Sequence, residues 1–87
     1  MGSRENIKLE LKRCLWQMYP ILREAGINLN IEWDQSLKVW IVSVGKKGHV
    51  RYAVLHEEDA LSCLNGKACI YLGVAFIHFA HFFESIA

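Results

Sequence analysis

The sequence predicts an α+β fold in which a three-stranded antiparallel meander is flanked by long N- and C-terminal helices, in the order α-β-β-β-α-α. Three patterns support this prediction. Apolar residues recur at helical spacing across 7–22, they alternate with polar residues across 27–33, and a charge-free apolar run covers 68–83. Short sequential connections favour a meander over other topologies. With 87 residues and no repeats or linkers, the chain is expected to form a single domain over residues 1–87.

The N-terminal segment 4–25 is predicted to form one long amphipathic helix. Its apolar residues recur at steps of three and four, and so share one face: Ile7, Leu11, Leu15, Met18 and Leu22. Ser3 is placed to act as the N-cap, and Gly26 follows the C-terminus of the helix. Because Pro20 removes one backbone hydrogen bond, we expect a kink or an interruption near residues 16–19.

Three strands are expected to follow, joined by short turns. Residues 27–33 alternate apolar and polar side chains, which is typical of a half-buried strand. A turn at 34–36 leads to a second strand at 37–44, whose two faces are both apolar. Such a strand is expected to be central and covered on both faces. A hairpin loop at 45–48 then leads into the third strand at 49–55.

Two helices complete the predicted fold. Glu57, Glu58 and Asp59 open a short helix at 58–64, Gly66 ends it, and the last helix spans 67–86. This last helix is apolar on all sides, and so small a chain has too little other surface to enclose it. One stripe of the helix is therefore expected to be an interface with a second copy, most simply around a two-fold axis. The candidate interface residues are Leu72, Phe76, Phe79, Phe82 and Phe83.

Charge, hydropathy and cysteine content restrict the class of protein. The formal net charge of +1 provides no overall field that would attract nucleic acid or an anionic membrane. The apolar run at 68–83 is too short to span a bilayer, so we expect no membrane association. Three cysteines, without a CxxC pair or a secretory leader, indicate a cytoplasmic location. Cys14, Cys63 and Cys69 each fall on an apolar helical face, so their thiols are expected to be reduced and slow to react.

The basic residues suggest an alternative role in binding nucleic acid. This role would use the 45–51 hairpin and the first helix, through Lys46, Lys47, Arg51, Lys8 and Lys12. The element order also resembles that of double-stranded-RNA-binding domains, which use such a hairpin loop together with a basic start to the last helix. The matching segment here, Gly66-Lys67-Ala68-Cys69, supplies only one basic residue. Nucleic acid is therefore not expected to be the main partner.

A second alternative is a pocket for a small apolar ligand between the sheet and the last helix. Its candidate lining residues are Trp40, Tyr71 and His78. His78 and His81 lie one helical turn apart, but the preceding cysteines lack the close spacing of a structural metal site, so no metal or other cofactor is expected. The sequence contains no phosphate-binding loop, nucleophile elbow or metalloprotease motif. We therefore assign no catalytic residue and expect no enzymatic activity.

These observations together favour a small accessory or regulatory module that acts through protein–protein interaction in the cytoplasm. The module is expected to be homo-oligomeric, and the sequence does not identify any other protein partner. A nucleic-acid-binding module and a binder of a small apolar ligand are the two alternatives.

Overall fold

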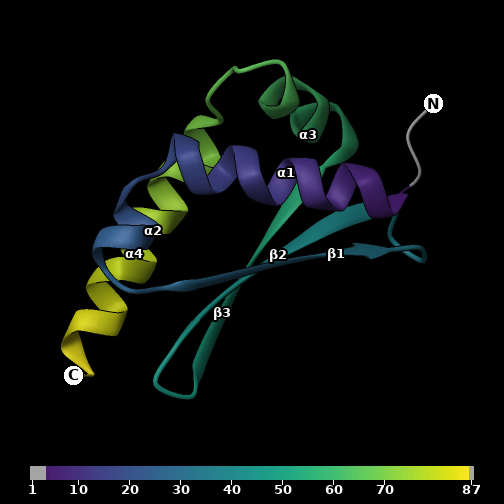
Figure 1. Cartoon of the computed structure of the whole chain (residues 1–87). Helices are drawn as coiled ribbons and strands as arrows, with labels where there is room; N and C mark the ends of the chain where they lie inside the picture. Colours follow the sequence, from purple (N-terminus) through teal and green to yellow (C-terminus); the bar gives the residue numbers. More distant parts are fainter. Residues whose placement is uncertain (1–3, 87) are drawn as a thin grey trace.

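The structure, a computed structural model, describes residues 4–86 of the chain (Figure 1). These residues form an α+β arrangement with helices before and after a three-stranded sheet, which confirms the predicted fold class. The elements are α1 (Arg4–Met18), α2 (Ile21–Glu24), β1 (Asn28–Asp34), β2 (Val39–Lys46), β3 (His49–His56), α3 (Glu57–Leu64) and α4 (Ile70–Ser85). The expected N-cap, Ser3, lies outside the described residues.

The expected interruption of the first helix is present. α1 and α2 are separated at Pro20, which has no N–H to continue the helical hydrogen bonds. After α2, Gly26 adopts a left-handed backbone with a φ of 67°. This conformation brings the Ile27 N–H within 2.9 Å of the Leu22 carbonyl oxygen, which ends the helix and turns the chain into β1.

The sheet is the expected antiparallel meander, with strand order β1-β2-β3. Ile31, Val42 and Ala53 lie side by side across it. Lys47 and Gly48 join β2 to β3 with φ values of 53° and 81°, and two left-handed residues define a type I′ turn. The expected four-residue loop is therefore a two-residue turn, because both strands extend to the residues that flank it.

The turn between β1 and β2 is longer than the sequence suggested, and β2 begins at Val39 instead of Leu37. The Asp34 carboxylate accepts a hydrogen bond from the Leu37 N–H at 2.9 Å. The Asp34 carbonyl accepts another from the Lys38 N–H at 2.7 Å, and Lys38 has a φ of 56°. These bonds keep Leu37 in the turn, where its side chain is exposed.

All helices lie on one face of the sheet (Figure 1). α1 runs along β1, α3 contacts β2 and β3, and α4 contacts β3 and α2. The side chains between the helices and the sheet form one cluster, whose largest fully buried members are Trp40, Phe76, Phe83, Leu11, Leu15, Leu22, Ile27, Ile31, Leu55, Leu72, Val42 and Val44.

The opposite face of the sheet is open, which corrects the expectation that β2 is covered on both faces. On this face Ile41 of β2 is half-buried, while Val50, Tyr52 and Val54 of β3 are exposed. The physical reason is that the helices are too few to form a second layer. One apolar face of β2 is therefore buried against the helices, and the other belongs to a partly open apolar surface.

Candidate interaction surface on the C-terminal helix

The start of α4 is held by the corner between α1 and α2. The Tyr19 hydroxyl accepts a hydrogen bond from the Cys69 N–H at 2.9 Å and donates one to the Cys69 carbonyl oxygen at 2.8 Å. The Tyr19 ring packs edge-on against Phe76, with 5.1 Å between the ring centroids. A methyl group at Gly73 would lie 3.5 Å from that ring, an ordinary van der Waals distance. Burial raises the pKa of the Tyr19 phenol above its ordinary value.

One face of α4 is buried against the rest of the chain. Leu72, Phe76, Ala80 and Phe83 recur at steps of four, four and three and are buried. They contribute to the cluster between the helices and the sheet. Because this face packs against the rest of the chain, the opposite face of α4 turns toward solvent.

The outward face of α4 carries an apolar strip that we call the outer stripe, formed by Ile70, Tyr71, Val74 and Ile77. Ile70 is 84% exposed and Ile77, the least exposed of the four, is 47% exposed. The α4 sequence contains no Lys, Arg, Asp or Glu before Glu84. An exposed apolar strip without charges is unusual on a soluble surface and is typical of an interaction site.

The interface residues expected from the sequence lie mostly inside the chain. Leu72, Phe76 and Phe83 are 0% exposed, and Phe79 and Phe82 are half-buried. The helix turns its phenylalanines inward, where they remove a large apolar area from water, and its outward face carries Ile70, Tyr71, Val74 and Ile77. Among the apolar faces of this helix, the one available to a second copy is the outer stripe.

Phe82 is occupied by contacts within the chain. The Arg51 guanidinium carbon lies 3.8 Å from the centroid of its ring, and the rings of His49 and Phe83 lie edge-on to it at 6.0 and 5.3 Å. These contacts join the end of α4 to the first residues of β3. They explain why this side chain is half-buried and is not the centre of an exposed patch.

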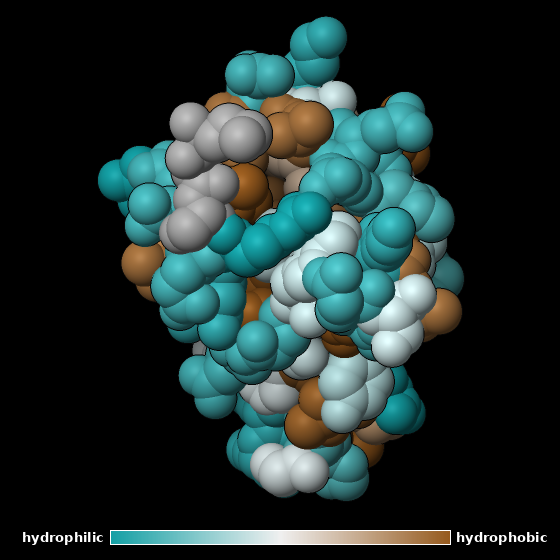
Figure 2. Space-filling view, turned by 90° about the vertical axis from the view of Figure 1, so that its right-hand side faces the viewer, coloured by the Kyte–Doolittle hydropathy of each residue, from teal (hydrophilic) through white to brown (hydrophobic). Residues whose placement is uncertain are grey.

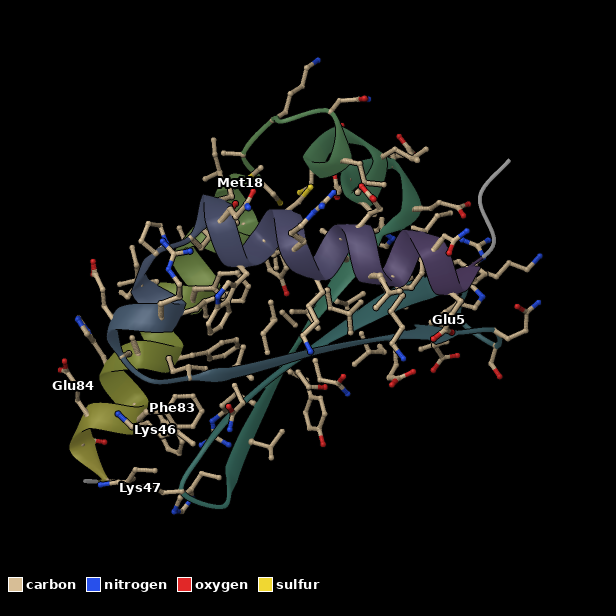
Figure 3. The ribbon with its side chains drawn as sticks, in the orientation of Figure 1. Glu5, Met18, Lys46, Lys47, Phe83 and Glu84 are labelled. Carbon is tan, nitrogen blue, oxygen red and sulfur yellow. The ribbon has the colours of Figure 1, made fainter. Side chains whose placement is uncertain are left out.

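The basic residues of the nucleic-acid alternative are divided between two regions. Figure 3 shows Lys46 and Lys47 at the β2–β3 hairpin, beside the end of α4 that carries Phe83 and Glu84. The other two lysines of the alternative lie on α1. Figure 2 shows a largely hydrophilic face at the N-terminal end of α1, with apolar side chains scattered over it.

Three of these five basic side chains have partners within the chain. Lys46 Nζ donates a hydrogen bond to the Ala25 carbonyl oxygen at 2.6 Å, and Lys8 Nζ lies 3.1 Å from a carboxylate oxygen of Glu32. The Arg51 guanidinium stacks on Phe82, as described above. Lys12 and Lys47 are exposed. The geometry therefore gives the nucleic-acid alternative no added support.

The residues of the predicted ligand pocket are not brought together. Trp40 is 1% exposed and packs against Trp33, with 5.1 Å between the ring centroids. Among the described residues, its Nε1 is the one buried side-chain nitrogen or oxygen without a hydrogen-bond partner. Tyr71 and His78 are exposed on α4. A groove of about 530 Å³ lies elsewhere and is lined by Leu9, Lys12, Arg13, Trp16, Asn28 and Leu29.

A second, smaller groove of about 270 Å³ lies beside two of the three thiols. It is lined by Cys14, Gln17, Met18, Cys63, Leu64 and Gly66. All three cysteines are free, and burial raises the pKa of the Cys63 thiol to about 11. Within residues 4–86, no three His, Cys, Asp or Glu side chains converge in a way that could hold a metal ion.

The outer stripe thus lies on the helix for which the sequence predicts an interface, but it consists of other residues. The sequence shows that α4 is apolar on all sides, and helical periodicity alone does not tell which side is exposed. No helix among residues 4–86 has the length and apolar character needed to cross a membrane. Comparison with known proteins finds no protein-family model, no curated protein and no solved structure that matches the chain.

Proposed function

We propose that the chain is a small accessory or regulatory module that acts through protein–protein interaction and self-associates through the outer stripe of α4. The observation that carries the proposal is the exposure of four large apolar side chains on one face of a helix that has no Lys, Arg, Asp or Glu before Glu84, namely Ile70, Tyr71, Val74 and Ile77. Soluble monomers seldom keep such a strip in water. Burial of the stripe against another chain removes these apolar side chains from water, which is favourable.

A second copy is the partner that fits the stripe best. The stripe contains no charge, so two copies face each other around a two-fold axis without like-charge repulsion. Each contact in a two-fold interface occurs twice. Complete burial of one Ile or Val side chain stabilises an assembly by about 1.5–3 kcal/mol, and side chains that are already half-covered contribute less. The gain from two stripes is offset in part by the entropy lost on association.

The stripe can be tested without disturbing the core. Val74→Glu and Ile77→Glu place a carboxylate at half-exposed positions, so the monomer is expected to stay folded while the interface is lost. The measurement is the molar mass by light scattering over a range of concentrations, where one chain has a mass of 10.0 kDa. We expect the wild type to exceed one chain and each variant to have a lower mass.

A matched control is available on another helix. Leu61 on α3 is 51% exposed, similar to Val74 at 50%, so Leu61→Glu introduces the same charge at similar exposure outside the stripe. It should leave the mass unchanged. Circular dichroism verifies that all variants are folded. A wild type that stays at 10.0 kDa at high concentration would contradict the proposal.

A further inference from the structure

The β2–β3 turn determines which backbone groups of β3 are free. In a two-residue type I′ hairpin, the flanking pair exchanges both hydrogen bonds, and here that pair is Lys46 and His49. Because hydrogen-bonded and non-hydrogen-bonded pairs alternate, the odd-numbered residues of β3 bond to β2. The even-numbered residues, including Val50, Tyr52 and Val54, direct their N–H and C=O groups away from the sheet.

The two edges of the sheet differ in accessibility. By the same alternation, Leu29 and Ile31 direct their backbone groups outward from β1. Leu29 and Ile31 are only 5% and 0% exposed, and α1 packs along β1, the strand at that edge (Figure 1). On β3, in contrast, Val50 and Tyr52 are 45% and 65% exposed. Of the two edges, β3 is therefore the one at which the outward-directed backbone groups belong to exposed residues.

The β3 edge lacks the usual protection against strand pairing. Native proteins block such edges with proline, a bulge or a charged side chain. β3 is eight residues long, contains no proline and pairs with β2 in an uninterrupted register. Its one Lys, Arg, Asp or Glu side chain is Arg51, which is held over the Phe82 ring. Such an edge is a template for another strand.

The ends of β3 carry opposite charges. The turn at its start bears Lys47, which is exposed, and α3 at its end opens with three acidic residues, Glu57, Glu58 and Asp59, of which Glu57 is paired with Arg4 of the same chain. An antiparallel partner with the same sequence places its acidic end beside the basic end of this strand. Charge complementarity therefore favours a second copy of the chain over an unrelated strand.

We propose that the β3 edges of two copies pair antiparallel around a two-fold axis and form one continuous six-stranded sheet. With the axis at Tyr52, Val50 lies opposite Val54 of the second copy, and Arg51 lies opposite Ala53 of the second copy. No like charges then face each other, and β-branched residues meet across the new pair. This interface does not depend on the outer stripe of α4, and a chain that uses both interfaces assembles into more than a dimer.

A disulfide across the axis tests the pairing directly. Directly opposed residues in a hydrogen-bonded antiparallel pair have Cα atoms about 5.5 Å apart, a separation that a disulfide spans readily. Tyr52→Cys, in a background with Cys14→Ser and Cys69→Ser, should therefore form a covalent two-chain species under mild oxidation. Ser43→Cys in the same background is the control, because Ser43 lies on the same sheet face but on the central strand.

A second variant removes the pairing without a covalent probe. Tyr52→Lys puts two like charges across the axis at a position that is 65% exposed, so the monomer should fold while the edge is blocked. We expect it to halve the mass measured by light scattering, whereas Leu61→Lys on α3 leaves the mass unchanged.

The outcomes separate this proposal from that for the outer stripe. If only the β3 edges pair, Val74→Glu leaves the mass unchanged and Tyr52→Lys halves it. If only the stripe associates, Val74→Glu lowers the mass, Tyr52→Lys does not, and Tyr52→Cys cross-links no faster than Ser43→Cys. That second pattern, or a wild type that remains monomeric, overturns the β3 proposal.

Discussion

The hydroxyl group of Tyr19 forms two hydrogen bonds with the backbone of a single residue, Cys69. It accepts one from the N–H at 2.9 Å and donates the other to the carbonyl oxygen at 2.8 Å. The two residues are 50 positions apart in the chain, so the contact joins the α1–α2 corner to the loop before α4. It therefore holds the helix that carries the outer stripe in its place.

Loss of this hydroxyl should destabilise the fold. Tyr19→Phe keeps the ring packed on Phe76 but leaves a partly buried N–H without its partner, so the free energy of unfolding should fall by about 1–3 kcal/mol. Urea denaturation measures the change as a lower midpoint with an unchanged slope. Tyr71→Phe is the control, because its side chain is exposed on α4. Equal midpoints for the two variants would show that the contact contributes nothing.

A methyl group at Gly73 should stabilise the protein. Its nearest neighbour would be a ring carbon of Tyr19 at 3.5 Å, an ordinary van der Waals distance. Since Gly in a helix interior costs about 0.5–1 kcal/mol relative to Ala, Gly73→Ala should raise the free energy of unfolding by up to that amount. Gly66→Ala should act in the opposite direction, because Gly66 has a φ of 86°. Thermal denaturation should show a higher melting temperature for Gly73→Ala and a lower one for Gly66→Ala. A lower melting temperature for Gly73→Ala would contradict the argument.

The fold was predictable because its signals are local. Alternation in β1, the break at Pro20 and the left-handed residues Gly26 and Gly66 are each visible within a few residues of sequence. The start of β2 was not predictable from the same evidence. It depends on the Asp34 carboxylate, which accepts the Leu37 N–H and extends the turn by two residues.

The candidate surface was less accessible to sequence reasoning, because exposure is a property of the packed molecule. Phe79 and Ile77 are both apolar and both fall on apolar stripes, and only the positions of α2 and β3 decide which stripe is covered. The open edge of β3 was equally hidden. The predicted meander already makes β3 an edge strand, but its openness also depends on where the helices pack, with α1 lying along β1, which the residues of β3 do not encode.

Cys63 should make the protein less stable at alkaline pH. Burial raises the pKa of its thiol from 9.0 to about 11, so between these values the unfolded chain has released a proton that the folded chain retains. The unfolded state then binds fewer protons, and the free energy of unfolding falls as the pH rises. The contribution is fully present below pH 9 and is lost progressively above it. Urea midpoints measured between pH 8 and about 11 should show this decline.

Cys63→Ala isolates the effect of the thiol. Over the same pH interval, the free energy of unfolding should fall less in the variant than in the wild type. It should still fall in both proteins, because burial also raises the pKa of Tyr19. The native Cys63 thiol should also react slowly with a thiol reagent at pH 8, because the thiolate is the reactive form. Parallel pH profiles for the wild type and the variant would contradict this assignment.

Arg4 should stabilise the fold more through Trp33 than through its ion pair. Its guanidinium carbon lies 3.6 Å from the centroid of the Trp33 ring, and its Nη1 lies 2.6 Å from a carboxylate oxygen of Glu57. The side chains of Arg4 and Glu57 are 46% and 50% exposed, so water and salt screen this pair strongly. Stacking of a cation on an exposed ring is worth about 0.5–1 kcal/mol.

Double-mutant cycles separate the two contacts. One cycle combines Arg4→Leu with Trp33→Leu, and the other combines Arg4→Leu with Glu57→Gln, with urea stability measured for each variant. We expect the Arg4–Trp33 coupling to be the larger and to persist at about 1 M salt, where the Debye length is only about 3 Å. The Arg4–Glu57 coupling should decline toward zero under the same conditions. Salt screens a contact between a guanidinium and a ring face much less than it screens charges that interact over a distance. If the Arg4–Trp33 coupling disappeared at high salt, the stabilisation would therefore come from long-range electrostatics and not from stacking on the ring.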